Sequence, residues 1–198
     1  MSIKINYFNK LNNKTSANFV LFVDEKFNID SLKKNISNSE FSYISDLLKN
    51  ADLKKDVLLF EINSKKKIFL VSVKKDLKAS DIESLGAKFH SYINYDKKND
   101  YSLISDTVNS KIKNFVGYFL HGLKLKSYEF NIYKSKKEKR LISINVFGDK
   151  NKISIQNQLR FKALEEGSFF ARDLVSEPGN ILHPDEYAKR INTLKKFG

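Results

Sequence analysis

Short, continuous apolar runs constrain the fold of this chain more than any other feature of its sequence. Three of them, at residues 19–23, 57–60 and 68–71, contain no polar residue and are too short for typical helices. A run of this kind is typical of a strand that is covered on both faces, as in α/β proteins. We therefore expect a sheet with helices packed on its two sides.

Alternation of apolar and polar residues predicts further strands, each with one exposed face. Residues 3–7 alternate in this way, and so do residues 130–132 and 142–146. The charged stretch 135–140 lies between the last two and indicates a turn. The pattern predicts an antiparallel hairpin near a sheet edge, with a solvated turn for which phosphate binding is the alternative role.

Apolar residues at helical spacing predict helices between these strands. One is expected over residues 80–93, with Ser80 and Glu83 as its capping box, a second over 108–123 and a weaker third over 39–48. Strands and helices that alternate along the chain predict an α/β domain with a mixed sheet and flanking helices.

A long helix is expected over residues 151–176, which contain no proline and a single glycine. Apolar or small residues form a stripe along it, and the small pair Ala163 and Gly167 would let another backbone approach closely. The stripe consists of Ile155, Leu159, Ala163, Gly167, Phe170 and Leu174.

Both prolines of the chain follow this helix. The stretch 177–180 (Glu-Pro-Gly-Asn) predicts a type II turn, because proline fixes φ at the second position and glycine accepts a positive φ at the third. Pro184 is expected to open another helix, with Tyr187, Ile191 and Leu194 on its apolar face. The predicted parts of the chain are an N-terminal domain at 1–149, a connecting helix at 150–177 and the start of a second domain at 178–198.

The net charge of +13 is compatible with binding to a polyanion, but the kind of basic residue disfavours sequence-specific recognition. Only four of the 36 basic residues are arginines, whose planar fork reads base edges, and the lysines are spread along the whole chain. We expect at most weak, salt-sensitive binding to nucleic acid. The absence of cysteine excludes disulfides, thiolate metal sites and cysteine nucleophiles.

The sequence shows no secretion signal and no membrane segment. Its first residues alternate apolar and polar side chains, and no apolar stretch approaches the ~20 residues of a membrane helix. We expect a soluble, cytoplasmic protein that has no membrane partner.

No set of residues has the spacing of a catalytic, cofactor-binding or metal-binding site, so no site residue is predicted. The acidic pairs Asp81 with Glu83, and Glu165 with Glu166, are typical of solvated helix faces. The seven glycines are scattered and no Gly-x-Ser-x-Gly elbow occurs, which disfavours a phosphate-cradling loop and a serine nucleophile. The histidines, which lack the spacing of a metal motif, are His90, His121 and His183.

The segment 163–184 resembles a segment of the leucyl aminopeptidase family, whose members are also called cytosol aminopeptidases. In that family a long helix leads through an A-R-D-L-V-N-x-P-x-N-x-L-x-P sequence from a smaller N-terminal domain into the catalytic domain. Ser176 stands where asparagine is usual, and His183 where threonine commonly caps the next helix. The matching residues are Ala171, Arg172, Asp173, Leu174, Val175, Pro178, Asn180, Leu182 and Pro184.

The resemblance implies an N-terminal α/β domain similar in topology to macro domains, within a family of two-metal peptidases that release N-terminal amino acids. In the family, the two divalent ions, such as zinc or manganese, are bound through motifs of the type V-G-K-G and N-T-D-A-E-G-R-L, and neither motif occurs here. We therefore expect a truncated, non-catalytic portion that is inactive alone, binds no cofactor itself and has the catalytic domain as its partner. The implied roles are assembly of a homo-oligomer, a hexamer in the family, and control of access to the active site.

Without a catalytic domain, the apolar stripe of the long helix would be exposed, so we expect self-association or poor solubility. Two other classes of function remain open: a macro-like domain that binds a nucleotide or ADP-ribose, and a lysine-rich DNA-binding module. The scattered glycines argue against the first, and the scarcity of arginine argues against sequence-specific forms of the second.

Overall fold

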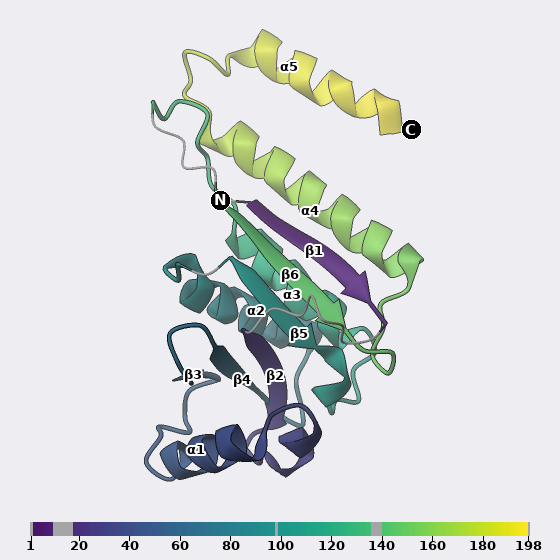
Figure 1. Ribbon diagram of the computed structural model, residues 1–198. Coiled ribbons are helices and arrows are strands. Elements are labelled where there is room, and N and C mark those ends of the chain that lie inside the picture. Colours follow the sequence, from purple (N-terminus) through teal and green to yellow (C-terminus); the bar gives the residue numbers. More distant parts are fainter. Residues whose placement is uncertain (1, 10–17, 98, 136–139, 198) are drawn as a thin grey trace.

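The computed structural model describes residues 2–9, 18–97, 99–135 and 140–197, in which strands and helices are interleaved (Figure 1). Each of the three continuous apolar runs lies in a strand and residues 3–7 lie in another, so these predictions are confirmed. The strands and α-helices in chain order are β1 (Ser2–Phe8), β2 (Phe19–Asp24), α1 (Asn38–Leu48), β3 (Val57–Glu61), β4 (Lys67–Val73), α2 (Ala79–Asn94), β5 (Asp100–Ile104), α3 (Phe115–Lys126), β6 (Leu141–Phe147), α4 (Ile155–Ser176) and α5 (Pro184–Asn192). Short 3-10 helices lie at Asp30–Lys34, Ser105–Thr107 and Thr193–Phe197.

The strands of the described chain form one six-stranded sheet in the order β1-β6-β5-β2-β4-β3. Neighbouring strands are parallel except at one edge, where β3 pairs antiparallel with β4. The first strand, β1, forms the other edge and pairs with β6, so that Ile3 lies opposite Ile142. The predicted α/β class with a mixed sheet and flanking helices is therefore confirmed.

Both faces of the central strands are buried. In β2, Val20 and Phe22 belong to the core that α2 and α3 cover, while Leu21 and Val23 belong to a second core beneath α1 and the 3-10 helix before it. Aromatic rings interlock in the first core, where Phe22 meets Phe119 edge-on with ring centroids 5.2 Å apart. Burial on both sides explains why β2 is an uninterrupted apolar run.

Helices α2 and α3 pack closely because each presents a glycine to the other. A Cβ added at Gly86 of α2 would lie 1.9 Å from the Phe119 carbonyl oxygen. One added at Gly122 of α3 would lie 1.9 Å from the Glu83 carbonyl oxygen. Only a residue without a side chain allows two backbones to approach this closely.

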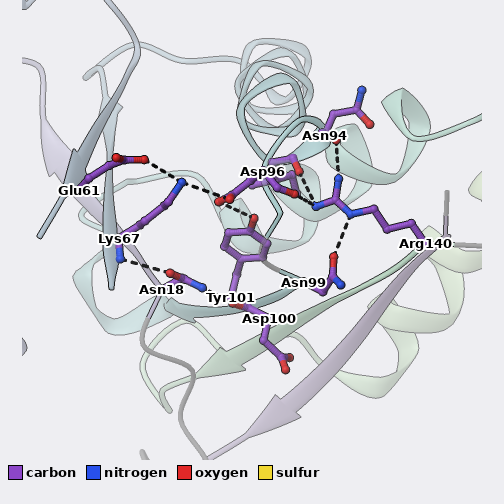
Figure 2. A network of polar contacts seen from close by, with 10 residues as sticks. Asn18, Glu61, Lys67, Asn94, Asp96, Asn99, Asp100, Tyr101 and Arg140 are labelled. Carbon is purple, nitrogen blue, oxygen red and sulfur yellow. Dashed lines mark hydrogen bonds and ion pairs between the residues drawn. The ribbon is translucent and has the colours of Figure 1, made fainter. Parts of the chain in front are cut away.

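A polar network joins the amino-terminal ends of β4, β5 and β6 (Figure 2). Lys67 donates hydrogen bonds to Glu61 Oε1 at 2.8 Å and to Asp96 Oδ1 at 3.1 Å. The Tyr101 hydroxyl donates to Asp96 Oδ2 at 3.0 Å, and burial raises the pKa of this phenol, which therefore stays protonated. Arg140 donates to backbone carbonyls at the end of α2, which a helix terminus leaves without intrahelical partners.

The predicted antiparallel hairpin is wrong. Residues 142–146 lie in β6, between β1 and β5 and parallel to both, and residues 130–132 form no strand. Most of the predicted turn, residues 136–139, lies outside the described residues. Alternation predicts which face of a strand is buried but not which strand is its neighbour, so pairing with distant strands could not be predicted.

Strand β5 was not predicted. Its residues Tyr101, Ser102 and Leu103 are all buried, so it is covered on both faces like β2. The polar Ser102 interrupts the apolar run by which such strands are recognised.

Helices α1 and α2 confirm the predictions at 39–48 and 80–93, but the capping box is wrong. Ser80 and Glu83 lie inside α2, and the helix is capped at Lys78, whose N–H donates to Asp81 Oδ2 at 2.7 Å.

Helix α3 begins at Phe115 rather than at residue 108. Asn114 precedes it with a φ of 59°, a left-handed conformation that no α-helix can contain. Residues 108–114 are therefore a connection. Val108 is buried in the core, and for this reason it fitted the apolar pattern that predicted a helix from residue 108.

The predicted type II turn after the long helix is also wrong. The Ile181 N–H donates to the Pro178 carbonyl at 2.9 Å, so the turn lies one residue later, and Gly179 has no positive φ. Pro184 opens α5 as predicted.

Helix α4 confirms the predicted long helix and runs beside β1, while α5 lies on the side of α4 away from the sheet (Figure 1). It starts after Ser154, whose hydroxyl accepts a hydrogen bond from the Asn157 N–H at 3.2 Å. Within the described chain, every helix is too short or too polar to cross a membrane.

Candidate functional site

The histidines lie apart from one another, as their spacing suggests. His90 and His121 are buried beside the core, whereas His183 is exposed at the start of α5. His121 Nδ1 is 2.9 Å from Glu83 Oε1 and its Nε2 has no partner among the described residues. In the described part of the chain, no three His, Cys, Asp or Glu side chains are arranged to hold a metal ion.

The acidic pairs considered from the sequence are engaged in separate contacts. Glu165 forms an ion pair with Lys124 of α3 at 3.1 Å, and the neighbouring Glu166 pairs with Lys162 at 3.7 Å on the exposed side of α4. Asp81 caps α2 through the Lys78 N–H. These carboxylates therefore stabilise helices and helix contacts rather than form one acidic centre.

A cleft of about 510 Å³ lies at the carboxyl ends of β2 and β4, beside the start of α2. Ligands of α/β proteins often bind at this edge of the sheet. Lys88 and Lys74 both pair with Asp56 there, and the Lys74 pair has a distance of 2.9 Å. The bond from Lys88 and, to a smaller extent, the bond from Lys74 hold the pKa of Asp56 below its usual range. Because further carboxylates also line the cleft, its charge is mixed, and this disfavours a diphosphate ligand. The lining carboxylates are Glu25, Asp56, Asp76 and Asp81.

The strongest candidate for a functional surface is α4, because one side of it is anchored and the other is bare. Phe161 anchors its first half. The Phe161 ring packs edge-on against Tyr118 at a centroid distance of 5.2 Å and lies 5.4 Å from the His121 ring. A Cβ at Gly117 of α3 would come within 2.4 Å of this ring, so the glycine makes room for it.

The second half of α4 is anchored on Tyr128, just after α3. The Tyr128 hydroxyl donates to Asp173 Oδ1 at 2.7 Å, and its ring packs against Phe169 at a centroid distance of 5.2 Å. Arg172 lies over the same ring, 5.5 Å from its centroid, and donates a hydrogen bond to the Leu125 carbonyl at 2.6 Å. Arg172 and Asp173, which belong to the segment of family resemblance, thus fasten α4 to the end of α3.

The opposite side of α4 carries most of the predicted apolar stripe. Ile155 is 76% exposed and Leu159 is 62% exposed, and Ala163 and Gly167 are exposed as well. Among the described residues, no atom outside the neighbouring helical backbone lies within 4 Å of a Cβ built at Gly167. The close approach of another backbone at Gly167 is therefore not made within the described chain, although Leu174 at the end of the stripe is buried.

Sequence reasoning missed the anchoring side of α4. Its residues recur every four positions, at Phe161, Glu165, Phe169 and Asp173, which places them on one helical face. Two of the four are acidic, so an apolar pattern does not include them. The recurring aromatic residues at 161 and 169 were the available signal.

No family model matches the chain. A probable cytosol aminopeptidase of Rickettsia typhi is 27% identical over 218 aligned positions, covering 96% of this chain and 41% of that protein. A probable cytosol aminopeptidase of Methylorubrum extorquens is 34% identical over 88 residues, which is 42% of this chain and 17% of that protein. The chain therefore spans less than half of the length of these curated relatives.

Solved structures share the fold. A mutant of tomato leucine aminopeptidase superposes with a TM-score of 0.72 over 99% of this chain and 42% of that chain, at 17% identity. The cytosol aminopeptidase of Coxiella burnetii has a TM-score of 0.63 over 96% of this chain and 37% of that chain, at 14% identity. The bottromycin maturation enzyme BotP in complex with Mn is also similar, with a TM-score of 0.65. Relatives that match along nearly the whole chain, together with this shared fold, show that the chain is similar to the leucyl (cytosol) aminopeptidases over almost all of its length.

Proposed function

We propose that this chain is the N-terminal, non-catalytic portion of a cytoplasmic leucyl aminopeptidase, a two-metal peptidase that releases N-terminal amino acids from peptides. In this proposal, α4 connects the α/β domain to a catalytic domain supplied by other sequence. The chain spans about two fifths of the length of a relative that matches along nearly all of it, which leaves room for such a domain.

The observation that carries the proposal is the two-sided character of α4. One side is fixed to α3 and Tyr128, and the other presents Ile155 and Leu159 with most of their surface exposed. Large apolar side chains that lie together on a surface are typical of protein interfaces. We infer that the catalytic domain, or further subunits of a homo-oligomer, cover this side, and that the domain thereby contributes to assembly and to control of access to the active site.

The described residues of this chain offer no site that fits the two divalent ions of the family. The described residues contain no group of three His, Cys, Asp or Glu side chains that could hold one ion. Hydrolysis through two ions requires several such ligands placed a few ångströms apart. The proposal therefore assigns metal binding to other sequence and no chemical step to this chain.

An association experiment tests the proposal. The chain is mixed with the separately produced remainder of a full-length relative, such as the Rickettsia typhi protein without its matched segment, and analysed by sedimentation velocity. We expect a complex that Leu159→Asp abolishes. Leu53→Asp is the matched control, because Leu53 is 43% exposed and lies outside α4. Failure of the wild-type chain to associate, or equal effects of the two substitutions, would contradict the proposal.

A further inference from the structure

Three segments of the described chain meet at the carboxylate of Glu177, the residue that follows α4. The Tyr133 hydroxyl, from the connection after α3, donates a hydrogen bond to Glu177 Oε2. Arg190 of α5 donates from Nη1 to Glu177 Oε1 at 2.7 Å. Arg190 also donates from Nε to Glu186 Oε1 at 3.2 Å, one turn earlier in α5.

Apolar packing holds α5 only weakly. None of its residues is buried, and Tyr187 and Ile191 on its apolar face are 47% and 38% exposed. A short helix is marginally stable in water by itself and depends on contacts with the rest of the protein. The orientation of α5 therefore depends strongly on the few polar contacts that reach it.

The Glu177 contacts are well suited to hold α5 in place. The Glu177 side chain is 2% exposed, so water competes little for its oxygens. Hydrogen bonds between ionised groups are roughly twice as strong as those between neutral ones. One carboxylate thus bonds at the same time to the α/β domain through Tyr133 and to α5 through Arg190.

We propose that Glu177 is a latch that fixes the angle between α4 and α5, and that α5 swings away from α4 when the latch opens. The latch is a conformational device of this chain and does not depend on the proposed peptidase role. Its open state leaves α5 without the bond between Arg190 and Glu177, and its closed state holds α5 in the position shown in Figure 1.

The chemistry of the three groups predicts that the latch opens in both acid and alkali. The bonds from Tyr133 and then Arg190 lower the pKa of Glu177, so its contribution is present above the ordinary glutamate pKa and is lost as the pH falls through the lowered value. The bond to Glu177 raises the pKa of Tyr133, so that contribution is lost as the pH rises through the raised value. Arg190 stays charged throughout, and Glu186 is the other ionisable group in contact with it.

Hydrogen exchange on the full chain tests the latch, with Glu177→Gln compared against Glu166→Gln. Glutamine keeps the size of the side chain but offers one acceptor to two donors. Glu166 is the control because its side chain is 61% exposed on α4 and pairs with its helical neighbour Lys162. We expect amide protection across residues 184–192 to fall about tenfold in Glu177→Gln and to stay unchanged in Glu166→Gln. Tyr133→Phe, which removes one donor, should give a smaller loss.

Protection of α2 serves as the measure of global folding in the same samples. Equal loss of protection in α2 and α5 would give Glu177 a role in overall stability and overturn the latch. Unchanged α5 protection in Glu177→Gln, or an α5 that already exchanges like an unstructured peptide in the wild-type chain, would overturn it too.

Discussion

The Tyr128 hydroxyl donates a hydrogen bond of 2.7 Å to Asp173, joining the end of α3 to the last turns of α4 across 45 residues of sequence. Burial and this bond raise the pKa of Tyr128, so the hydroxyl remains a donor at neutral pH. The neighbouring Arg172 lies over the same ring. Part of the segment that carries the family resemblance therefore has a structural role, because it fastens a long helix to the α/β domain.

Removing the Tyr128 hydroxyl should loosen this attachment. Tyr128→Phe keeps the ring contacts with Phe169 and Arg172 but deletes the bond to Asp173, so we expect a loss of about 1 kcal/mol in the free energy of unfolding. Urea denaturation measures it. Tyr43→Phe is the control, because Tyr43 is 46% exposed on α1. Equal unfolding midpoints for the two variants would contradict a role of the hydroxyl in anchoring α4.

The glycines of the helix layer should respond to alanine in opposite ways. Gly86→Ala and Gly122→Ala place a Cβ against the backbone of the facing helix, so each should destabilise the protein by about 1–3 kcal/mol. Gly167→Ala meets nothing within 4 Å and lies in mid-helix, so it should stabilise the protein by about 1 kcal/mol. Chemical denaturation of the three variants checks these signs, and a stabilising effect at Gly86 or Gly122 would refute the described packing of α2 on α3.

The strands of this fold differ in how clearly the sequence predicts them, because they differ in the pattern of apolar residues that they require. The central strands β2 and β4 are apolar because both their faces are covered, so they could be recognised directly. Their neighbours could not, since the pairing of β6 with β1 and β5 depends on contacts between distant parts of the chain. For this reason β6, which lies inside the sheet, was predicted as one strand of a hairpin near the sheet edge.

The surface of α4 illustrates the same limit. Its bare side, with Ile155 and Leu159, is apolar and was predicted as the side that is exposed unless a catalytic domain covers it. Its anchored side contains Glu165, which becomes favourable there because Lys124 of α3 pairs with it at 3.1 Å. Hydrophobic periodicity counts such a paired carboxylate as a solvent-facing residue, so the side of α4 that packs on the α/β domain could not be recognised from the apolar pattern.

Acid should weaken the ion pairs beside the cleft at the carboxyl ends of the strands. Because Lys88 and Lys74 lower the pKa of Asp56, its contribution is present above the ordinary aspartate pKa and is lost as the pH falls through the lowered value. Both lysines are more than half exposed, so we expect Asp56→Asn to cost less than about 1 kcal/mol at pH 7 and still less at pH 3.

Urea unfolding midpoints at the two pH values measure this difference. Asp46→Asn is the matched control, because Asp46 of α1 pairs with Lys49 and both side chains are more than two thirds exposed. A destabilisation by Asp56→Asn that grows as the pH falls would contradict the assigned role of the two lysines.

The bare side of α4 should cause the chain to self-associate at high concentration, as apolar patches on protein surfaces commonly do. We expect the mean sedimentation coefficient of the wild-type chain to rise with concentration and that of Ile155→Asp to remain constant. Ile132→Asp, at a 50% exposed residue outside α4, should behave like the wild-type chain. A sharply monomeric wild-type profile at high concentration would count against this surface.

We propose that this polypeptide supports an aminopeptidase without performing its chemistry. The most direct measurement is the rate at which the purified chain hydrolyses a chromogenic aminoacyl anilide in the presence of manganese or zinc. We predict no turnover above that of the metal-containing buffer, because the described residues supply no set of ligands for a two-ion centre. Turnover that grows with protein concentration and disappears with a chelator would contradict the claim.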